Sequence, residues 1–192
     1  MARSVLYMAM SLDGYIAGPD DSPENPGGDG FMRLHEWFVG EDGEFRRPDG
    51  PAGDLYDELD GYGAIVAGRR TVEQVDHWSG DRNGVRIFVP SHRPPGPTVA
   101  GYPLVSYVSD GIASAMAQAK AAAGDRYVLV HGAYTAQRAL EAGVLDELEI
   151  SHVPVLFGAG RRLFDVLPAR IELDIIRVLN TPEATHIRYR VR

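Results

Sequence analysis

The sequence predicts an α/β fold: a single domain with a mixed, mostly parallel central sheet, helices on its faces, and antiparallel strands at its C-terminal end. Two patterns support this prediction. Short apolar runs alternate with helical patterns as far as residue 143, an order typical of a sheet with crossover helices. Beyond it, apolar and alternating runs follow one another, as in antiparallel strands. The length of 192 residues, with 44% hydrophobic and 24% charged residues, suits one buried core and excludes wholesale disorder.

The parallel strands are predicted from five runs that are apolar on both faces and therefore suit burial between helices. They cover residues 5–10, 64–67, 85–89, 104–108 and 127–130. Helical patterns between and beside them cover residues 54–59, 71–78, 112–123 and 135–142. The third of these is rich in alanine and stops before Gly124, as helices commonly do.

The C-terminal part is predicted to form antiparallel strands over residues 148–157, 171–179 and 185–191. In the last strand Ile187, Tyr189 and Val191 alternate with arginines, so we expect an edge strand with two different faces. A structural dimer that buries this apolar row is one possible function of such an edge.

The segment of residues 18–53 differs from the rest of the chain. It holds eight of the 22 glycines and five of the 13 prolines, without clear periodicity. Phe31, Leu34, Trp37 and Phe38 are nevertheless spaced like one face of a short helix, and disordered segments are poor in aromatic residues. We therefore favour an ordered lid over a disordered insertion within the single domain.

Charge and composition exclude several classes of function. The net charge of −8 comes from residues 20–60, where thirteen acidic residues face three arginines, while the rest of the chain is slightly basic. An acidic chain without a basic stripe argues against nucleic-acid binding, but a local phosphate site remains compatible. The absence of cysteine excludes disulfides and thiolate chemistry. The N-terminal apolar run of six residues is too short for a signal peptide or a membrane span, so we expect a cytoplasmic protein that does not bind membranes.

Three strand ends carry groups that suit an anionic ligand. The first continues into Gly68-Arg69-Arg70-Thr71, where Thr71 is placed to cap the next helix. The second continues into Gly132-Ala133-Tyr134-Thr135 and again enters a helix, and the third delivers Ser91-His92-Arg93. Arginine presents a planar fork that matches phosphate oxygens. Because the carboxyl ends of parallel strands face the ligand crevice in α/β sheets, together they predict a phosphate site.

Each of these motifs has a plainer interpretation. The arginines after Gly68 also suit an ordinary strand-to-helix turn with solvated side chains, and the glycines at 158 and 160 are more typical of a loop. His131 suits either a packed strand end or a cofactor contact. The six histidines lack the spacing of metal ligands, so we predict no metal.

Several motifs together resemble the dihydrofolate reductase-like family, in its branch with the C-terminal reductase domain of the riboflavin-biosynthesis deaminase-reductase. The resemblance covers nearly the whole chain except residues 19–53. It rests on residues 8–18 (MAMSLDGYIAG), 66–71 (VAGRRT), 130–133 (VHGA), 139–148 (ALEAGVLDEL) and 154–164 (PVLFGAGRRLF).

The resemblance implies an NADPH-dependent reductase that is commonly a homodimer. It places Gly68, Arg69, Arg70 and Thr71 at the cofactor phosphates, Ser91, His92 and Arg93 near the adenosine 2′-phosphate, Gly132, Ala133, Tyr134 and Thr135 at the pyrophosphate, and Met8, Ala9 and Ile16 around the nicotinamide. One departure concerns Ala133, which stands where the family usually has a second glycine. Its methyl group would crowd the pyrophosphate.

Asp13 and Asp54 are the carboxylates placed to supply a proton or a polarising group during hydride transfer. For Asp54 this is implied by the acidic residue that orients the pterin in folate reductases. Asp13 equally suits capping of its own turn, and Asp54 suits a helix N-cap. Trp37, together with Phe31 in the same segment, could stack on a heteroaromatic substrate, whereas Trp78 is expected in the core.

The first hypothesis is therefore an NADPH-dependent oxidoreductase that reduces a small pyrimidine- or pterin-like heterocycle. NADH and a deazaflavin stay open as carriers. The acidic segment disfavours a substrate with a ribose phosphate. The alternative, motivated by Ala133 and by the lack of a clear proton donor, is a nucleotide-binding protein of the same fold without turnover, as a regulatory protein or a structural dimer.

Overall fold

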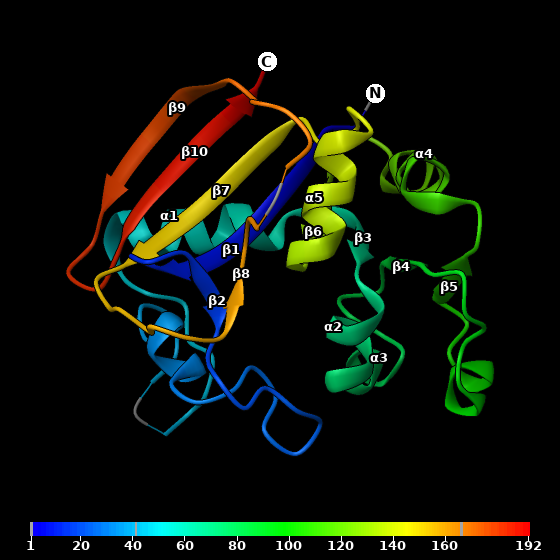
Figure 1. Ribbon diagram of the computed structural model, residues 1–192, viewed down its shortest axis with the longest axis horizontal. Coiled ribbons are helices and arrows are strands. Elements are labelled where there is room, and N and C mark those ends of the chain that lie inside the picture. Colours follow the sequence, from blue (N-terminus) through cyan, green and yellow to red (C-terminus); the bar gives the residue numbers. More distant parts are fainter. Residues whose placement is uncertain (1, 41, 166) are drawn as a thin grey trace. The chain divides into compact units, whose positions relative to one another are not determined.

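The computed structural model describes residues 2–40, 42–165 and 167–192, and within them an eight-stranded sheet is the central feature (Figure 1). Its strand order is β5-β4-β3-β6-β1-β7-β10-β9. The pairs from β5 to β1 are parallel, and β9 and β10 are antiparallel, which confirms the predicted fold class. The strands are β1 (Ser4–Ser11), β3 (Tyr62–Ala67), β4 (Arg86–Pro90), β5 (Val105–Val108), β6 (Tyr127–His131), β7 (Glu147–Val153), β9 (Leu173–Asn180) and β10 (Thr185–Val191). A separate antiparallel ribbon pairs β2 (Tyr15–Ala17) with β8 (Arg161–Arg162).

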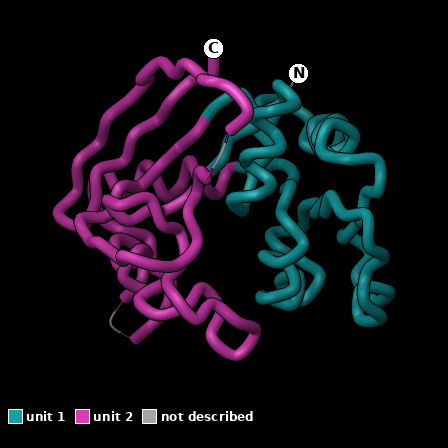
Figure 2. Tube along the Cα trace, in the orientation of Figure 1, with its two compact units in different colours: residues 1–6, 62–147 teal, residues 7–61, 148–192 magenta. Residues whose placement is uncertain are grey.

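The chain divides into two compact units (Figure 2). Unit 1 comprises the chain up to Leu6 and Tyr62–Glu147, and its helices are α2 (Arg69–Gln74), α3 (Asp76–Ser79), η2 (Pro97–Gly101), α4 (Gly111–Ala123) and α5 (Ala133–Glu141). Unit 2 comprises Tyr7–Gly61 and Leu148–Arg192, with η1 (Phe31–Leu34) and α1 (Gly50–Asp60). In the described part of the chain no helix has the length and apolar character to cross a membrane.

The core of unit 1 forms around β3, which is buried along its whole length. Helix α4 packs on β3 and β4 and buries Ala115, Met116 and Ala119. The small alanine side chains let the helix approach the sheet closely. This arrangement explains why these strands are apolar on both faces in the sequence.

Two predicted helices need correction. The single helix over 71–78 is wrong, because α2 ends at Gln74 and Asp76 to Ser79 adopt left-handed backbone angles. Thr71 does not cap α2, because Gly68 is the N-cap residue and Thr71 lies in the first turn.

Helix α1 begins at Gly50, four residues earlier than predicted. Its first turns contain glycine and proline, which lower helix propensity in the sequence. Gly53 is needed there because a Cβ atom would lie 2.3 Å from the carbonyl oxygen of Pro48.

The segment of residues 18–53 contributes to the core of unit 2. Leu34 is fully buried in a cluster with Ala9 and Val153, and Trp37 packs with Leu55 of α1. Glu41 lies outside the described residues. Trp37 and Phe38 of the segment therefore serve packing in this structure.

The strands β9 and β10 carry an apolar face that is open to solvent. A bulge leaves Ile176 without an opposite residue and keeps the other apolar pairs in register on one face. We call Leu173, Ile175, Val178, Ile187, Tyr189 and Val191 the β9–β10 apolar face.

The two faces of β10 differ from the expectation. The strand is antiparallel as predicted, but β9 and not β10 forms the sheet edge. The charged face of β10 is the more buried one, since His186 and Arg188 lie in the interior while the apolar row is half-buried. Arg188 is tolerated there because it pairs with Glu58.

Candidate functional site

In unit 1 the carboxyl ends of three neighbouring strands lie at one edge of the sheet. Strands β4, β3 and β6 are parallel and adjacent, with Val66 in register with both Phe88 and Val130. The segments that follow these strands are the three that the sequence singles out for an anionic ligand. The structure therefore brings the predicted phosphate-binding residues of unit 1 to one place.

Two of these segments approach each other closely at their glycines. The N–H of Gly68 donates to the carbonyl of His131 over 3.3 Å. A Cβ atom on Gly68 would lie 2.7 Å from Thr135 Oγ1, and one on Gly132 would lie 3.0 Å from Thr71 Oγ1. Gly132 also has a φ of 96°, which favours glycine. The site thus requires both glycines, because a Cβ atom at either position would lie within 3.0 Å of a threonine hydroxyl of the other segment.

Helix α5 starts directly after Gly132, and no side chain caps its N-terminus. The first N–H groups of a helix lack intrahelical partners and attract anions. Ala133 and Thr135 are buried, whereas Tyr134 is exposed. Because the methyl group of Ala133 is buried in the protein, it does not cover the solvent-facing side of this helix end.

Arg69 lies beside the loop that follows β4. Its Nη1 donates to Pro94 O over 2.9 Å, to Arg93 O over 3.1 Å and to Ser91 Oγ over 3.4 Å. Its Nε donates to Glu73 over 2.6 Å. Within the described residues its Nη2 has no hydrogen-bond partner, so part of the guanidinium is left for a ligand. Arg70, His92 and Arg93 are exposed at the same strand ends.

His131 ends β6 with its ring 6.4 Å from the indole of Trp78. Trp78 is half-buried rather than in the core, and Arg82 stacks on it at 4.8 Å. The sequence did not mark Trp78 as a site residue, although its ring lies next to that of His131, the strand residue that precedes Gly132.

In unit 2 the residues implied at the nicotinamide lie on β1 and β2. Ala9 and Ile16 are buried, and Met8 is half-buried. Ala9 belongs to the apolar cluster that contains Leu34 and Val153.

Asp13 holds the turn after β1. Its carboxylate accepts hydrogen bonds from Ser11 Oγ (2.6 Å), Phe157 N (3.0 Å) and Gly158 N (2.7 Å). The hydrogen bond from Ser11, helped by those two backbone donors, lowers the pKa of Asp13 to about 2. A carboxyl group that stays ionised at neutral pH cannot donate a proton, so the geometry favours the capping role weighed above.

Asp54 is an exposed residue within α1 and lies 3.6 Å from Arg47. It is not the N-cap, because α1 begins at Gly50. Phe31 is half-buried against His35, with ring centroids 4.4 Å apart. Trp37 is 5% exposed, between Phe38 and His186. As substrate contacts, Phe31 and Trp37 stay predictions.

The sequence reasoning missed a partly buried cluster of charges in unit 2. Glu58 of α1 accepts hydrogen bonds from Arg177 (2.5 Å) and Arg188, and Arg177 also donates to Glu149 over 2.9 Å. Glu149 is fully buried. Its place in an apolar run and the arginines of β10 are the only signals in the sequence, and neither reveals the pairing.

The charges in this cluster compensate one another. Burial raises the pKa of Glu149 despite the nearby Arg177 and Arg188. For Glu58 burial acts in the same direction, but the hydrogen bond from Arg177 and the charge of Arg188 outweigh it and lower the pKa. Next to the cluster, Ser151 Oγ lies 2.7 Å from His186 Nδ1. Burial, with the charge of Arg177, lowers the pKa of His186 to about 4.

The described residues contain no group of three or more histidine, aspartate or glutamate side chains placed to hold a metal ion.

Comparison with known proteins identifies relatives over the full chain. The family model of the RibD C-terminal domain matches residues 4–187. The Bacillus subtilis protein YwjB, which is uncharacterised, is 24% identical over an alignment of 196 residues that covers 97% of each chain.

Two solved structures have the same fold. A putative riboflavin biosynthesis protein from Shewanella sp. PV-4 superposes with a TM-score of 0.75 at 25% identity and covers 100% of this chain and 99% of its own. Dihydrofolate reductase from Enterococcus faecalis, solved as a complex with NADP(H), superposes with a TM-score of 0.62 at 15% identity. The superposition covers 99% of this chain and 96% of the reductase. The fold is therefore dihydrofolate reductase-like.

Proposed function

The chain belongs to the RibD C-terminal domain family, and from this premise we propose that it is an NADPH-dependent oxidoreductase that reduces a small pyrimidine- or pterin-like heterocycle. The family and the fold of its neighbours support a reductase-type function. The complex of the Enterococcus faecalis enzyme with NADP(H) supports the choice of a nicotinamide cofactor.

The observation that carries the proposal is the close approach of Gly68 and Gly132 at the ends of β3 and β6. A Cβ atom on either would contact a threonine of the other segment. Around this contact lie the N-terminus of α5 and the free Nη2 of Arg69. Backbone N–H groups and a guanidinium are the donors that a pyrophosphate and a ribose phosphate need. The residues present therefore fit the cofactor.

NADPH, when bound, supplies a hydride to the substrate. In this proposal Gly68, Arg69, Arg70, Thr71, Gly132, Ala133, Tyr134 and Thr135 hold its phosphates, and Ser91, His92, Arg93 and His131 flank them. Met8, Ala9 and Ile16 stay the residues predicted at the nicotinamide. The protein thereby contributes mainly binding and alignment, which are worth several orders of magnitude in rate.

Titration with NADPH, followed by the quenching of tryptophan fluorescence, tests the cofactor. We expect saturable binding in the micromolar range, and Gly132→Val should abolish it. Oxidation of NADPH at 340 nm across a panel of pyrimidines and pterins then tests turnover. A wild-type protein without any response at millimolar NADPH contradicts the proposal.

A nucleotide-binding protein without turnover is the second candidate. It is favoured by the state of Asp13, whose carboxylate is fully engaged and ionised, and by the exposed position of Asp54. Tight NADPH binding without oxidation across the panel would support this candidate against the first.

We also propose that two copies associate through the β9–β10 apolar face. Ile175 is 64% and Val178 54% exposed, and no charged side chain interrupts the face. Its exposed apolar area, on the order of several hundred Å², is comparable to the largest patches of typical monomers. A two-fold interface brings the same face of two copies together, and an uncharged face at a sheet edge allows this without repulsion between like charges.

A further inference from the structure

The four residues of α3 form a left-handed turn in unit 1. Asp76, His77, Trp78 and Ser79 have φ values of 43°, 55°, 53° and 55°, and none of them is glycine. Each such residue is strained, because its Cβ approaches the following carbonyl oxygen. Consecutive strained residues persist only where surrounding contacts hold them, and such strain gathers at functional sites.

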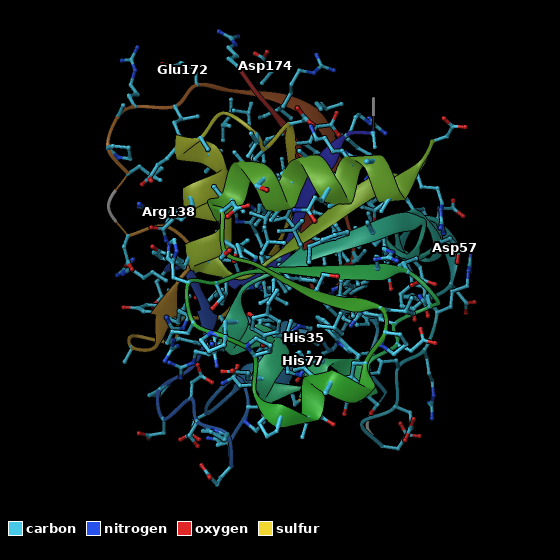
Figure 3. The ribbon with its side chains drawn as sticks, turned by 90° about the vertical axis from the view of Figure 1, so that its right-hand side faces the viewer. His35, Asp57, His77, Arg138, Glu172 and Asp174 are labelled. Atoms are coloured by element: carbon cyan, nitrogen blue, oxygen red, sulfur yellow. The ribbon has the colours of Figure 1, made fainter. Side chains whose placement is uncertain are left out.

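The turn changes which side chains face the protein interior. If α2 continued as a right-handed helix, His77 would lie on the same face as Arg70 and Glu73. Both of these residues are exposed, so His77 would be exposed as well. The reversal instead buries His77, which is 4% exposed, and leaves Val75 at the surface. His77 is labelled in Figure 3. The strain is therefore coupled to the placement of this one imidazole.

Specific contacts hold the turn in place. Tyr102 OH donates to Asp76 Oδ2 over 2.8 Å. Gly80 admits the Tyr102 ring, since a Cβ atom there would lie 2.3 Å from it. His77 Nε2 lies 2.9 Å from Tyr107 OH, with the two ring centroids 6.0 Å apart. The buried imidazole is thus linked directly to Tyr107 of β5.

Tyr107 in turn contacts Arg69. The guanidinium carbon of Arg69 lies 5.6 Å from the centre of the Tyr107 ring, within the range of a cation–π interaction. The same guanidinium is bound to Glu73 and to the loop at Ser91–Pro94, while Nη2 stays open. A chain of contacts therefore runs from the strained turn through His77 and Tyr107 to the arginine at the phosphate site.

We infer that the left-handed turn at 76–79 is a positioning device that sets Arg69, through His77 and Tyr107, to recognise a phosphate monoester on the ribose of a dinucleotide. This inference rests on the proposed function and adds to it a determinant of NADPH over NADH. His77 and Tyr107 are positioning residues that do not touch the ligand themselves. Arg69 is the residue that does.

The test compares the dissociation constants of NADPH and NADH in His77→Phe, His77→Gln and Tyr107→Phe. His77→Phe and Tyr107→Phe remove the hydrogen bond, so we expect about tenfold weaker NADPH binding and less than about a twofold change for NADH. His77→Gln keeps a side-chain group that can bond to Tyr107 and should retain most of the discrimination. Tyr56→Phe, which removes a phenol hydroxyl in unit 2, is the control and should change neither constant.

A measurement without cofactor distinguishes the positioning role of His77 and Tyr107 from the proposed function. The Nε–H resonance of Arg69 should exchange slowly in wild-type protein and His77→Gln, and fast in Tyr107→Phe and His77→Phe. If His77→Phe fails to fold, Tyr107→Phe decides, because it keeps the aromatic ring. Wild-type protein that binds neither dinucleotide overturns the proposed function. Unchanged Arg69 exchange in Tyr107→Phe, or an equal loss of both affinities, overturns the positioning role.

Discussion

The carboxylate of Asp13 accepts a 2.7 Å hydrogen bond from the backbone N–H of Gly158 and so ties the turn after β1 to the segment after β7. Arg162 Nη1 strengthens this link by donating to the carbonyl of Asp13 over 3.0 Å. Asp13, which the sequence marks as a candidate to supply a proton, is therefore an ionised carboxylate that holds a turn in this structure. At pH values above the usual carboxyl pKa, the charge of Asp13 stabilises the fold. This contribution is lost as the pH falls toward 2.

Asp13→Asn should lower the melting temperature at pH 7 and leave NADPH affinity within about twofold. The amide cannot accept from three donors as a carboxylate does, so the turn loosens. The melting difference should shrink between pH 4 and pH 2, where wild-type Asp13 becomes protonated. Asp125→Asn, at an exposed turn, is the control. Unchanged stability with abolished turnover would assign Asp13 a catalytic role instead.

Gly68→Ala should destabilise the protein by about 1–2 kcal/mol, as overpacking of a buried contact does. The new methyl group would lie 2.7 Å from Thr135 Oγ1, and the buried, β-branched threonine has few alternative rotamers. The double variant Gly68→Ala/Thr135→Ala should recover most of the loss. Urea unfolding measures the free energy of unfolding of both variants. Gly96→Ala is the control, since a Cβ atom there meets nothing within 4 Å. Additive effects in the double variant would contradict the predicted contact.

The strands and the glycine turns could be predicted because their signals are local. Residues 64–67 are apolar on both faces, and Gly68 and Gly132 follow strands directly. The left-handed turn at His77 could not be predicted, because its residues carry no glycine and its stability depends on Tyr102 and Tyr107, which lie 26 and 30 residues away along the chain.

The partly buried charge cluster was missed for a similar reason. Glu149 interrupts an apolar run, but its partner Arg177 lies 28 residues further along the chain. Pairing of this kind appears only when β7, β10 and β9 are adjacent. For Trp37 and Phe31 the sequence signal is visible but ambiguous. Aromatic residues in a segment rich in glycine suit both packing and stacking on a ligand.

Arg177→Met should destabilise the protein by about 3 kcal/mol, because the fully buried Glu149 loses its hydrogen-bonded partner. The double variant Arg177→Met/Glu149→Gln removes the buried charge that has lost its hydrogen bond and should recover about half of this loss. Urea unfolding at pH 7 gives the free energies. Arg192→Met breaks an exposed pair with Asp174 and should cost less than about 1 kcal/mol. A loss for Arg177→Met no larger than this control would contradict the argument.

Ile175→Asp should convert the proposed dimer to a monomer by placing a charge in the centre of the β9–β10 apolar face. Truncation of a hot-spot residue at the centre of an interface costs about 2 kcal/mol or more, and a charge placed there adds to this cost, so we expect the dimer dissociation constant to rise at least about 30-fold. Size-exclusion chromatography with light scattering measures the mass across a dilution series. Leu156→Asp, at an equally exposed site outside this face, should leave the mass unchanged. A monomeric wild-type protein at 100 micromolar, or a dimeric Ile175→Asp, would refute the interface.

His186 should make folding stability depend on pH between about 4 and 6.5. Burial lowers its pKa to about 4, whereas the unfolded chain takes up the proton near 6.5, so the unfolded state binds more protons in this window. Stability should therefore fall as the pH falls from 6.5 toward 4, by about 2–3 kcal/mol at pH 4.5 from this residue alone. His186→Gln keeps a polar partner for Ser151 and removes the titration, so its stability curve should be flatter across the window. His92→Gln, at an exposed histidine, should keep the wild-type slope when urea unfolding is measured from pH 4.5 to 7.5. Parallel curves for wild type and His186→Gln would contradict this prediction, because they would mean that His186 takes up its proton equally in the folded and unfolded states.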